Sequence, residues 1–306
     1  MAPSEESQKL TELFKTLAAN FPQDGNSFLE RCVYDQVHRA GKECPGVSYE
    51  DITIPNGPAC KWVRPDNAAA GNAMLFMHGG GFSFGSPNGH RMLTAHLAKA
   101  CACVALSVDY RLAPQHPYPA PLDDCMTAYQ FLLDQGYAPS KIALAGDSCG
   151  GGLVTSVPLA AMQRKLPSPA ASISLSPLYD VAATGGTMDS NEENDVLNTK
   201  PFCAMLADRY TRSKSELKVD PLVSPLFASP EQARQLPPHW ISVAGYDMLR
   251  DHGERMAEKL KQAGVEVKLE VHDGQQHVFE FMAGNAPEAD DSIGRIGKWV
   301  RAKLEG

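Results

Sequence analysis

The stretch IALAGDSCGG, residues 142–151, decides the fold of this chain. Its first four residues are apolar and predict a short buried strand, and residues 153–164 predict the helix that follows. Between them, glycines flank Ser148 and permit the sharp turn that brings a serine hydroxyl to the end of a sheet. The pattern is typical of a catalytic serine, although a glycine-rich turn without a chemical role stays an alternative at this point.

Short apolar segments alternate with longer helical ones outward from this stretch. The predicted strands are residues 73–77, 103–108, 142–145, 173–176, 240–244 and 265–271. This alternation predicts an α/β fold with a mostly parallel, twisted sheet and helices on both faces. Upstream, residues 47–54 and 59–64 predict an antiparallel hairpin with an Asn-Gly turn. Residues 4–40 predict two amphipathic helices.

Residues 183–224 break this alternation. They are rich in Asp, Asn, Thr and Ser and contain one helix candidate, residues 202–210. We expect this stretch, called the cap segment below, to cover the carboxyl edge of the sheet together with N-terminal cap helices in residues 1–45. The catalytic domain then consists of residues 46–182 and residues 225–306.

The composition favours a globular protein without a nucleic-acid or membrane partner. The 306 residues are 43% hydrophobic and 21% charged, which suffices for a sizeable core. The formal net charge of -8 argues against nucleic acid and anionic membranes, because both call for a basic surface. The N-terminus lacks a secretory pattern, and no apolar run reaches the length of about 18 residues that a membrane span needs. We therefore expect a soluble, cytoplasmic protein.

The eight cysteines show neither a Cys-x-x-Cys pair nor the spacing of metal ligands. Free cysteine is among the residue types most often buried. We therefore expect mostly buried, reduced thiols and no metal site.

A second glycine-rich segment, HGGGF at residues 78–82, follows a predicted strand. Only glycine lets the backbone approach closely enough to point consecutive N–H groups at a developing oxyanion. We expect the N–H groups of Gly79 and Gly80 to form an oxyanion hole with that of Cys149, which begins the helix after the serine. The Cys149 thiol lies off the apex of the turn and is not the expected nucleophile. The spacing is not that of a phosphate-binding loop, and His78 is expected to make structural hydrogen bonds.

An activated serine needs a histidine as base and a carboxylate that orients this base. Asp247 and His277 each lie in a loop after a late predicted strand, where the carboxyl ends of parallel strands meet. We therefore predict a triad of Ser148, Asp247 and His277.

Other residues of the same types fit this role less well. His272 lies at the end of a predicted strand rather than in a loop that reaches the serine. Asp251 is better explained as the cap of the helix that follows it. Asp180 precedes the cap segment and is expected to fix a turn.

The chain resembles the hormone-sensitive lipase family of α/β-hydrolases, which includes the bacterial family IV esterases and arylacetamide deacetylase. The resemblance rests on HGGGF at 78–82, DYRLAPQHPYPAPLDD at 109–124, GDSCGG at 146–151, GYDMLRD at 245–251 and QQHVF at 275–279. It implies Ser148 as the nucleophile, Asp247 as the acid and His277 as the base, and a cap built partly from the N-terminal helices.

The resemblance also implies an oxyanion hole formed by the N–H groups of Gly79, Gly80 and Cys149. Three positions depart from the family pattern. Cys149 replaces the usual alanine, Gln115 replaces glutamate, and Val278 replaces a common glycine. None of these changes removes a catalytic group.

These features predict a serine carboxylesterase that hydrolyses short-chain or aromatic esters through an acyl-enzyme and needs no cofactor. An amidase or lactonase with the same triad stays an alternative, because the acyl-transfer chemistry is shared. A non-catalytic small-molecule receptor of the same fold is another, although such receptors lose the base. Phe82, Phe84, Phe202 and Tyr210 are the candidates to line the substrate pocket, and a place in the core of the cap is an equal alternative for each of them. The resemblance also implies a homodimer through the last strand, residues 265–271.

Overall fold

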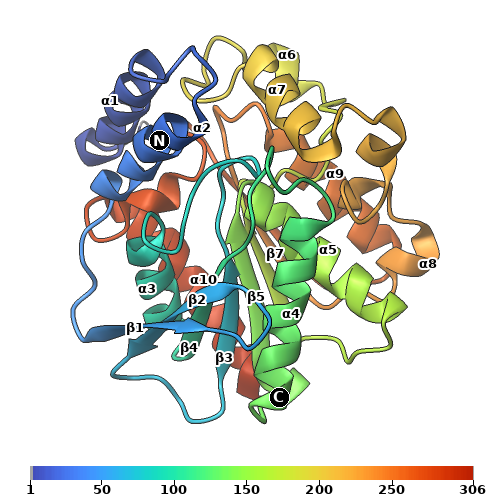
Figure 1. Cartoon of the computed structure of the whole chain (residues 1–306). Helices are drawn as coiled ribbons and strands as arrows, with labels where there is room; N and C mark the ends of the chain where they lie inside the picture. The colour runs from blue at the N-terminus through green and yellow to red at the C-terminus, as the bar shows by residue number, and fades with distance from the viewer. Residues whose placement is uncertain (1–2, 306) are drawn as a thin grey trace.

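A sheet of eight strands forms the centre of residues 3–305, the part of the chain that the computed structural model describes (Figure 1). The strand order is β1-β2-β4-β3-β5-β6-β7-β8. β1 pairs with β2 and β2 with β4 in antiparallel fashion, and the other pairs are parallel. The strands are β1 Val47–Thr53, β2 Ala59–Pro65, β3 Ala73–Met77, β4 Val104–Asp109, β5 Ile142–Asp147, β6 Ala171–Leu175, β7 His239–Ala244 and β8 Val267–His272. The predicted α/β fold is confirmed.

The central strands are buried on both faces. Every residue of β3, β5, β6 and β7 is buried. Along β3, Met74 and Phe76 face one hydrophobic cluster, whereas Leu75 and Met77 face another. A strand covered on both sides has no position that faces water, which explains why these segments are mostly apolar. β8 lies at the edge of the sheet, and the homodimer expected there stays a prediction.

Two layers of helices cover the sheet. α3 and α10 pack on one face, and α4, α5 and α9 pack on the other. The α-helices are α1 Glu5–Ala19, α2 Ser27–Tyr34, α3 Arg91–Ala100, α4 Ala120–Asp134, α5 Cys149–Gln163, α6 Thr187–Ser190, α7 Lys200–Thr211, α8 Pro230–Ala233, α9 Arg250–Gln262 and α10 Pro287–Glu305. The 3-10 helices are η1 Asp35–Ala40, η2 Pro139–Lys141, η3 Ser215–Val219, η4 Pro225–Phe227 and η5 Phe279–Met282. No helix within residues 3–305 combines the length and the apolar character that crossing a bilayer requires.

The first predicted helix, α1, is tied to the C-terminal helix. Ser4 caps α1 by accepting the N–H of Ser7. The N–H and the hydroxyl of Ser4 also donate to the carboxylate of Glu288 on α10, at 2.7 and 2.8 Å. Leu10 and Phe14 on the apolar side of α1 are buried in the same cluster as α10. The N-terminal segment is therefore packed on the catalytic half of the chain.

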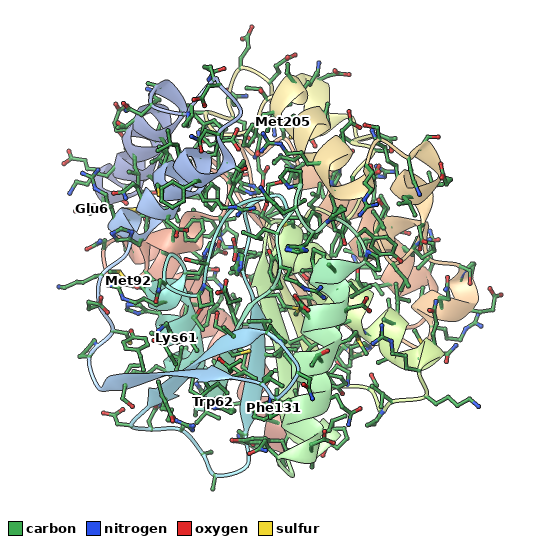
Figure 2. All side chains as sticks on the ribbon, in the orientation of Figure 1. Glu6, Lys61, Trp62, Met92, Phe131 and Met205 are labelled. Carbon is green, nitrogen blue, oxygen red and sulfur yellow. The ribbon has the colours of Figure 1, made fainter. Side chains whose placement is uncertain are left out.

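The N-terminal helices and the cap segment lie at the same end of the molecule, where α1 and α2 face α6 and α7 across the top of Figure 1. Met205 on α7 lies at this end in Figure 2, whereas Trp62 and Phe131 lie toward the other. An ion pair joins the two groups of helices, because Arg209 on α7 donates to both carboxylate oxygens of buried Glu30 on α2 at 2.8 and 3.0 Å. The division of the chain into cap and catalytic domain stays a prediction.

All eight cysteines are free thiols. Six of them are buried, Cys203 is half-buried, and Cys32 on α2 is exposed. The expectation of mostly buried, reduced thiols is therefore confirmed.

We predict opposite effects for two alanine substitutions in α10. A Cβ at Gly297 would overlap the carbonyl oxygen of Ala100 on α3, so Gly297→Ala should destabilise the fold by about 1–3 kcal/mol. Gly294 is exposed, and a Cβ there would meet no atom within 4 Å. Gly294→Ala should therefore stabilise α10 by about 0.5–1 kcal/mol. Urea unfolding measures both changes, and equal stabilities of the two variants would contradict the close packing of α10 on α3.

Candidate active site

Ser148 lies at the apex of the turn between β5 and α5. Its φ of 54° and ψ of -121° fall outside the regions that L-residues usually adopt. A Cβ on Gly150 would overlap the carbonyl oxygen of Met77, so only glycine lets α5 begin this close to the end of β3. The turn places the serine at the N-terminus of α5, where the helix dipole is positive.

His277 and Asp247 form a buried hydrogen bond at the carboxyl edge of the sheet. Nδ1 of His277 lies 2.7 Å from Oδ2 of Asp247. Asp247 follows β7 and His277 follows β8. The other carboxylate oxygen of Asp247 accepts the N–H of Leu249 at 2.8 Å. A proton on Nδ1 that is donated to Asp247 leaves Nε2 of His277 free to accept one.

The charges around His277 favour its protonated form. Burial lowers the pKa of His277, but the carboxylate of Asp247 raises it, with smaller contributions from Asp195 and Asp147. The net result is a pKa above the usual 6.5. A histidine with this balance is a stronger base than a free imidazole, which suits the removal of a proton from a hydroxyl group.

Ser148 and His277 line one small cavity of about 40 Å³. Its walls come from the loops at the sheet edge, from the end of α2 and from the cap segment. Phe82, Phe84 and Phe202, three of the four aromatic residues expected in the substrate pocket, also line this cavity.

The fourth aromatic residue, Tyr210, does not line the cavity. It is fully buried, and its ring stacks on that of Phe82 with centroids 3.6 Å apart. Tyr210 therefore supports the pocket wall from behind. Of the two alternatives for Tyr210, its burial agrees with a place in the core, because α7 turns this side chain away from the cavity.

The glycine loop after β3 points one N–H group elsewhere than the predicted oxyanion hole requires. The N–H of Gly79 donates to Oδ1 of Asp147 at 3.1 Å, and Gly79 does not line the cavity. Gly80 and Gly81 do line it, at φ angles of 111° and 57° that favour glycine. Within residues 3–305, no backbone carbonyl oxygen in the turns and loops accepts the N–H of Gly80 or that of Cys149. The bond to Asp147 argues against Gly79 as an oxyanion donor, and Gly81, which lines the cavity, becomes a candidate beside Gly80.

The thiol of Cys149 is buried against the glycine loop. It accepts the N–H of Phe82 at 3.2 Å and lies 3.7 Å from the hydroxyl of Tyr110. Burial raises the pKa of Cys149 to about 12, so the side chain is a neutral thiol at physiological pH. A neutral, buried thiol is a poor nucleophile, which agrees with the prediction that Cys149 does not have this role.

Buried polar groups support the glycine loop from below. The hydroxyl of Tyr110 donates to the carbonyl oxygen of His78 at 2.6 Å, and Nδ1 of His78 lies 2.8 Å from the carbonyl oxygen of Gly79. Burial lowers the pKa of His78 to about 3, so this ring is neutral. Behind it, Nε2 of His90 lies 3.4 Å from Oδ2 of Asp147. His78 thus makes the structural contacts that the sequence indicated.

The three residues set aside as alternatives lie outside the cavity. His272 ends β8, and Asp180 fixes a turn as expected by accepting the N–H two residues later at 2.9 Å. Asp251 does not cap α9, which has no side-chain cap. Its carboxylate instead accepts the N–H of Gly186 at 2.7 Å, because the cap segment passes over the first turn of α9. The helix-cap prediction for Asp251 was wrong.

Sequence analysis missed two residues of the cap segment that contact the loop of Asp247. Nδ2 of Asn191 donates to the carbonyl oxygen of Asp247 at 2.8 Å, and Asp195 accepts the N–H of Met248 at 2.9 Å. Both side chains are buried. Their spacing of four residues in a polar run was a signal for one face of a helical turn, but the run alone does not show that this face is buried.

Two departures from the family pattern can be placed in the structure. Val278 adopts φ 49° and ψ 50°, a left-handed conformation that glycine enters more easily, and its N–H donates to the hydroxyl of Ser176 at 3.0 Å. Gln115 accepts a hydrogen bond from the guanidinium of Arg31 at 2.7 Å. Neither residue lines the cavity.

Residues 74–281 match a protein family described as an alpha/beta hydrolase fold. The chain belongs to this family. The acetyl-hydrolase of Streptomyces hygroscopicus is 31% identical over 271 residues, which cover 89% of this chain and 88% of that protein. The ethyl acetate hydrolase of Pseudomonas putida is 33% identical over 75% of this chain and 73% of that protein. The crystal structure of an esterase from the bacterial hormone-sensitive lipase family superposes with a TM-score of 0.92 at 35% identity, covering 99% of this chain and 100% of that one.

These likenesses confirm the resemblance of this alpha/beta hydrolase to the hormone-sensitive lipase family that the motifs indicated. They also confirm the predicted enzyme class, that of hydrolases acting on carboxylic ester bonds. The matched residues include the loops of Ser148, Asp247 and His277.

We predict that the acid limb of the pH profile of this alpha/beta hydrolase lies above pH 6.5. The base must be neutral, and since the pKa of His277 is raised above 6.5, kcat/KM should fall as the pH decreases through that raised value. Asp247→Asn removes the main charge that raises this pKa, so the limb should move to lower pH while kcat falls by about 10⁴-fold. Ester hydrolysis measured across this range tests both effects. A flat profile between about pH 5 and pH 8 would contradict the role of His277.

Proposed function

We propose that the protein is a serine carboxylesterase that hydrolyses esters of short carboxylic acids. In this proposal Ser148 is the nucleophile, His277 is the general base and Asp247 is the carboxylate that orients the base. The observation that carries the proposal is the shared cavity. A serine at the apex of a strained turn and a histidine held by a buried carboxylate line the same small space.

The reaction begins when Nε2 of His277 takes the proton of Ser148 and the serine oxygen attacks the ester carbonyl. The carboxylate of Asp247 stabilises the imidazolium that forms. His277 then donates its proton to the leaving alcohol, which leaves an acyl-enzyme. Water activated by His277 attacks the acyl group, releases the acid and restores the serine. None of these steps requires a cofactor.

The oxyanion of each tetrahedral intermediate needs fixed donors. We assign this role to the N–H groups of Gly80, Gly81 and Cys149. Support comes from the two glycines on the cavity wall and from the position of Cys149 at the N-terminus of α5. The Gly79 N–H contributes indirectly, since its bond to Asp147 holds the loop beside the nucleophile turn.

The size of the cavity supports a short acyl group. A volume of about 40 Å³ holds roughly three water molecules at about 10–15 Å³ each, which is comparable to an acyl group of two or three carbons. A second cavity of about 490 Å³ shares Tyr34, Leu197 and Phe202 with it and provides room for a larger alcohol group. The names of the two enzyme relatives, acetyl-hydrolase and ethyl acetate hydrolase, point to the same substrate class.

We predict that Ser148→Ala lowers kcat for p-nitrophenyl acetate by about 10⁴-fold or more, because the nucleophile is lost. A fluorophosphonate should label the unaltered protein once and leave this variant unlabelled, as measured by mass spectrometry. The matched control is Ser48→Ala, an exposed serine on β1, which should keep full activity. Wild-type activity in Ser148→Ala would overturn the assignment.

We predict that kcat/KM for p-nitrophenyl esters is highest for the acetyl to butyryl esters. For the octanoyl ester kcat/KM should be lower by about tenfold or more. Leu206→Ala enlarges the small cavity and should raise the relative rate for the longer esters. Val219→Ala, an exposed change in the same cap segment, should leave the profile unchanged. A preference for octanoyl in the unaltered protein would contradict the short-acyl proposal, and faster cleavage of the matching anilides would favour the amidase alternative.

A further inference from the structure

The cap segment binds the loop that carries Asp247, called the acid loop below. Nδ2 of Asn191 donates to the carbonyl oxygens of Gly245 and Asp247 at 3.0 and 2.8 Å. Oδ2 of Asp195 accepts the N–H of Met248 at 2.9 Å. Two side chains of the cap segment thus bind three backbone groups of the acid loop, before, at and after the acid itself.

These two side chains are buried and are themselves fixed. Asn191 is 9% exposed and Asp195 is 6% exposed. The N–H of Asp195 donates to the carbonyl oxygen of Asn191 at 3.0 Å, so the two residues lie on one helical turn. Oδ1 of Asp195 also accepts the N–H groups of Leu197 and Asn198 at 2.9 and 2.8 Å. The N–H bonds from Met248 and Asn198 favour the charged form of this carboxylate, and they oppose part of the rise in its pKa that burial and Asp247 cause.

The same turn contacts the loop that carries His277, called the base loop below. The side-chain oxygen of Gln276 accepts the N–H of Val196 at 3.3 Å, and its amide nitrogen donates to the carbonyl oxygen of Asn194 at 2.9 Å. Residues 191–196 therefore bind both the acid loop and the base loop.

Stability alone gives no reason for a carboxylate at position 195. Burial and the nearby charge of Asp247 raise the pKa of Asp195, so its ionised form costs free energy at this place. A well-packed apolar side chain is often as stabilising as a buried charge. What the carboxylate adds is a directed bond to the Met248 N–H and a second negative charge near His277.

We propose that Asn191 and Asp195 are positioning residues for Asp247, so that the triad is complete only while the cap segment is docked on the acid loop. The inference rests on the proposed esterase function for its kinetic test. Neither residue lines the cavity, so both act through the acid loop rather than on the substrate. The charged groups that raise the pKa of His277 are Asp247, Asp195 and Asp147.

The test compares Asp195→Asn and Asn191→Ala with two controls from the same turn. We expect each variant to lower kcat for p-nitrophenyl acetate by about tenfold with less than about a twofold change in KM, because a displaced acid impairs chemistry rather than binding. The controls are Glu192→Gln and Glu193→Gln, two exposed side chains. Both controls should keep wild-type kcat.

Two further readouts separate positioning from loss of structure. In Asp195→Asn the pKa of His277, titrated by NMR, should fall by about 0.5 units or more because one of the three negative charges is gone. In Asn191→Ala, where no charge is lost, the pKa of His277 should fall by less than in Asp195→Asn. Labelling of Ser148 by a fluorophosphonate, which needs no ester substrate, should slow about tenfold in both variants.

Wild-type kcat and labelling rates in Asn191→Ala, or an unmoved His277 titration in a folded Asp195→Asn, would overturn the proposal. If Asp195→Asn does not unfold cooperatively, this variant is not properly folded and gives no test. The labelling rate of Asn191→Ala then decides whether the proposal holds. If the unaltered protein hydrolyses no ester while titration and labelling respond as expected, the proposed function fails and the positioning role stands.

Discussion

The close contact between β3 and α5 fixes the position of Ser148. Gly150 has no room for a side chain against the carbonyl oxygen of Met77, and the serine next to that contact adopts a strained backbone conformation. Because β3 and β5 are neighbouring parallel strands, the same contact brings the glycine loop after β3 beside the serine. One packing constraint thus sets the positions of both the candidate nucleophile and the candidate oxyanion donors.

The remaining members of the candidate site follow from strand direction. Parallel strands end at one edge of the sheet, so the loops after β5, β7 and β8 meet there. This is why Asp247 and His277 could be predicted from chain order and from the apolar runs before them. The observed bond between the two side chains agrees with that reasoning. Each predicted strand corresponds to an observed one, with ends that differ by no more than two residues. For the central strands the reason is that burial on both faces favours a mostly apolar run.

Sequence reasoning failed where the outcome depends on contacts between distant segments. Three consecutive glycines are equivalent in sequence, and only the position of the Asp147 carboxylate shows that the Gly79 N–H is engaged. Asp251 was misassigned for the same reason, since it binds the cap segment, and the sequence could not decide whether Tyr210 faces the pocket or packs behind Phe82. A polar run such as residues 191–195 indicates a loop unless its burial is known.

One of the eight cysteines has an exposed thiol, which allows selective chemical labelling of the protein. Cys32 lies on α2, while the half-buried Cys203 lies on α7, where burial raises its pKa to about 12 and makes it unreactive. A maleimide dye therefore attaches to α2 without any engineered mutation. The labelled helix also carries Glu30, whose ion pair with Arg209 joins the N-terminal helices to α7.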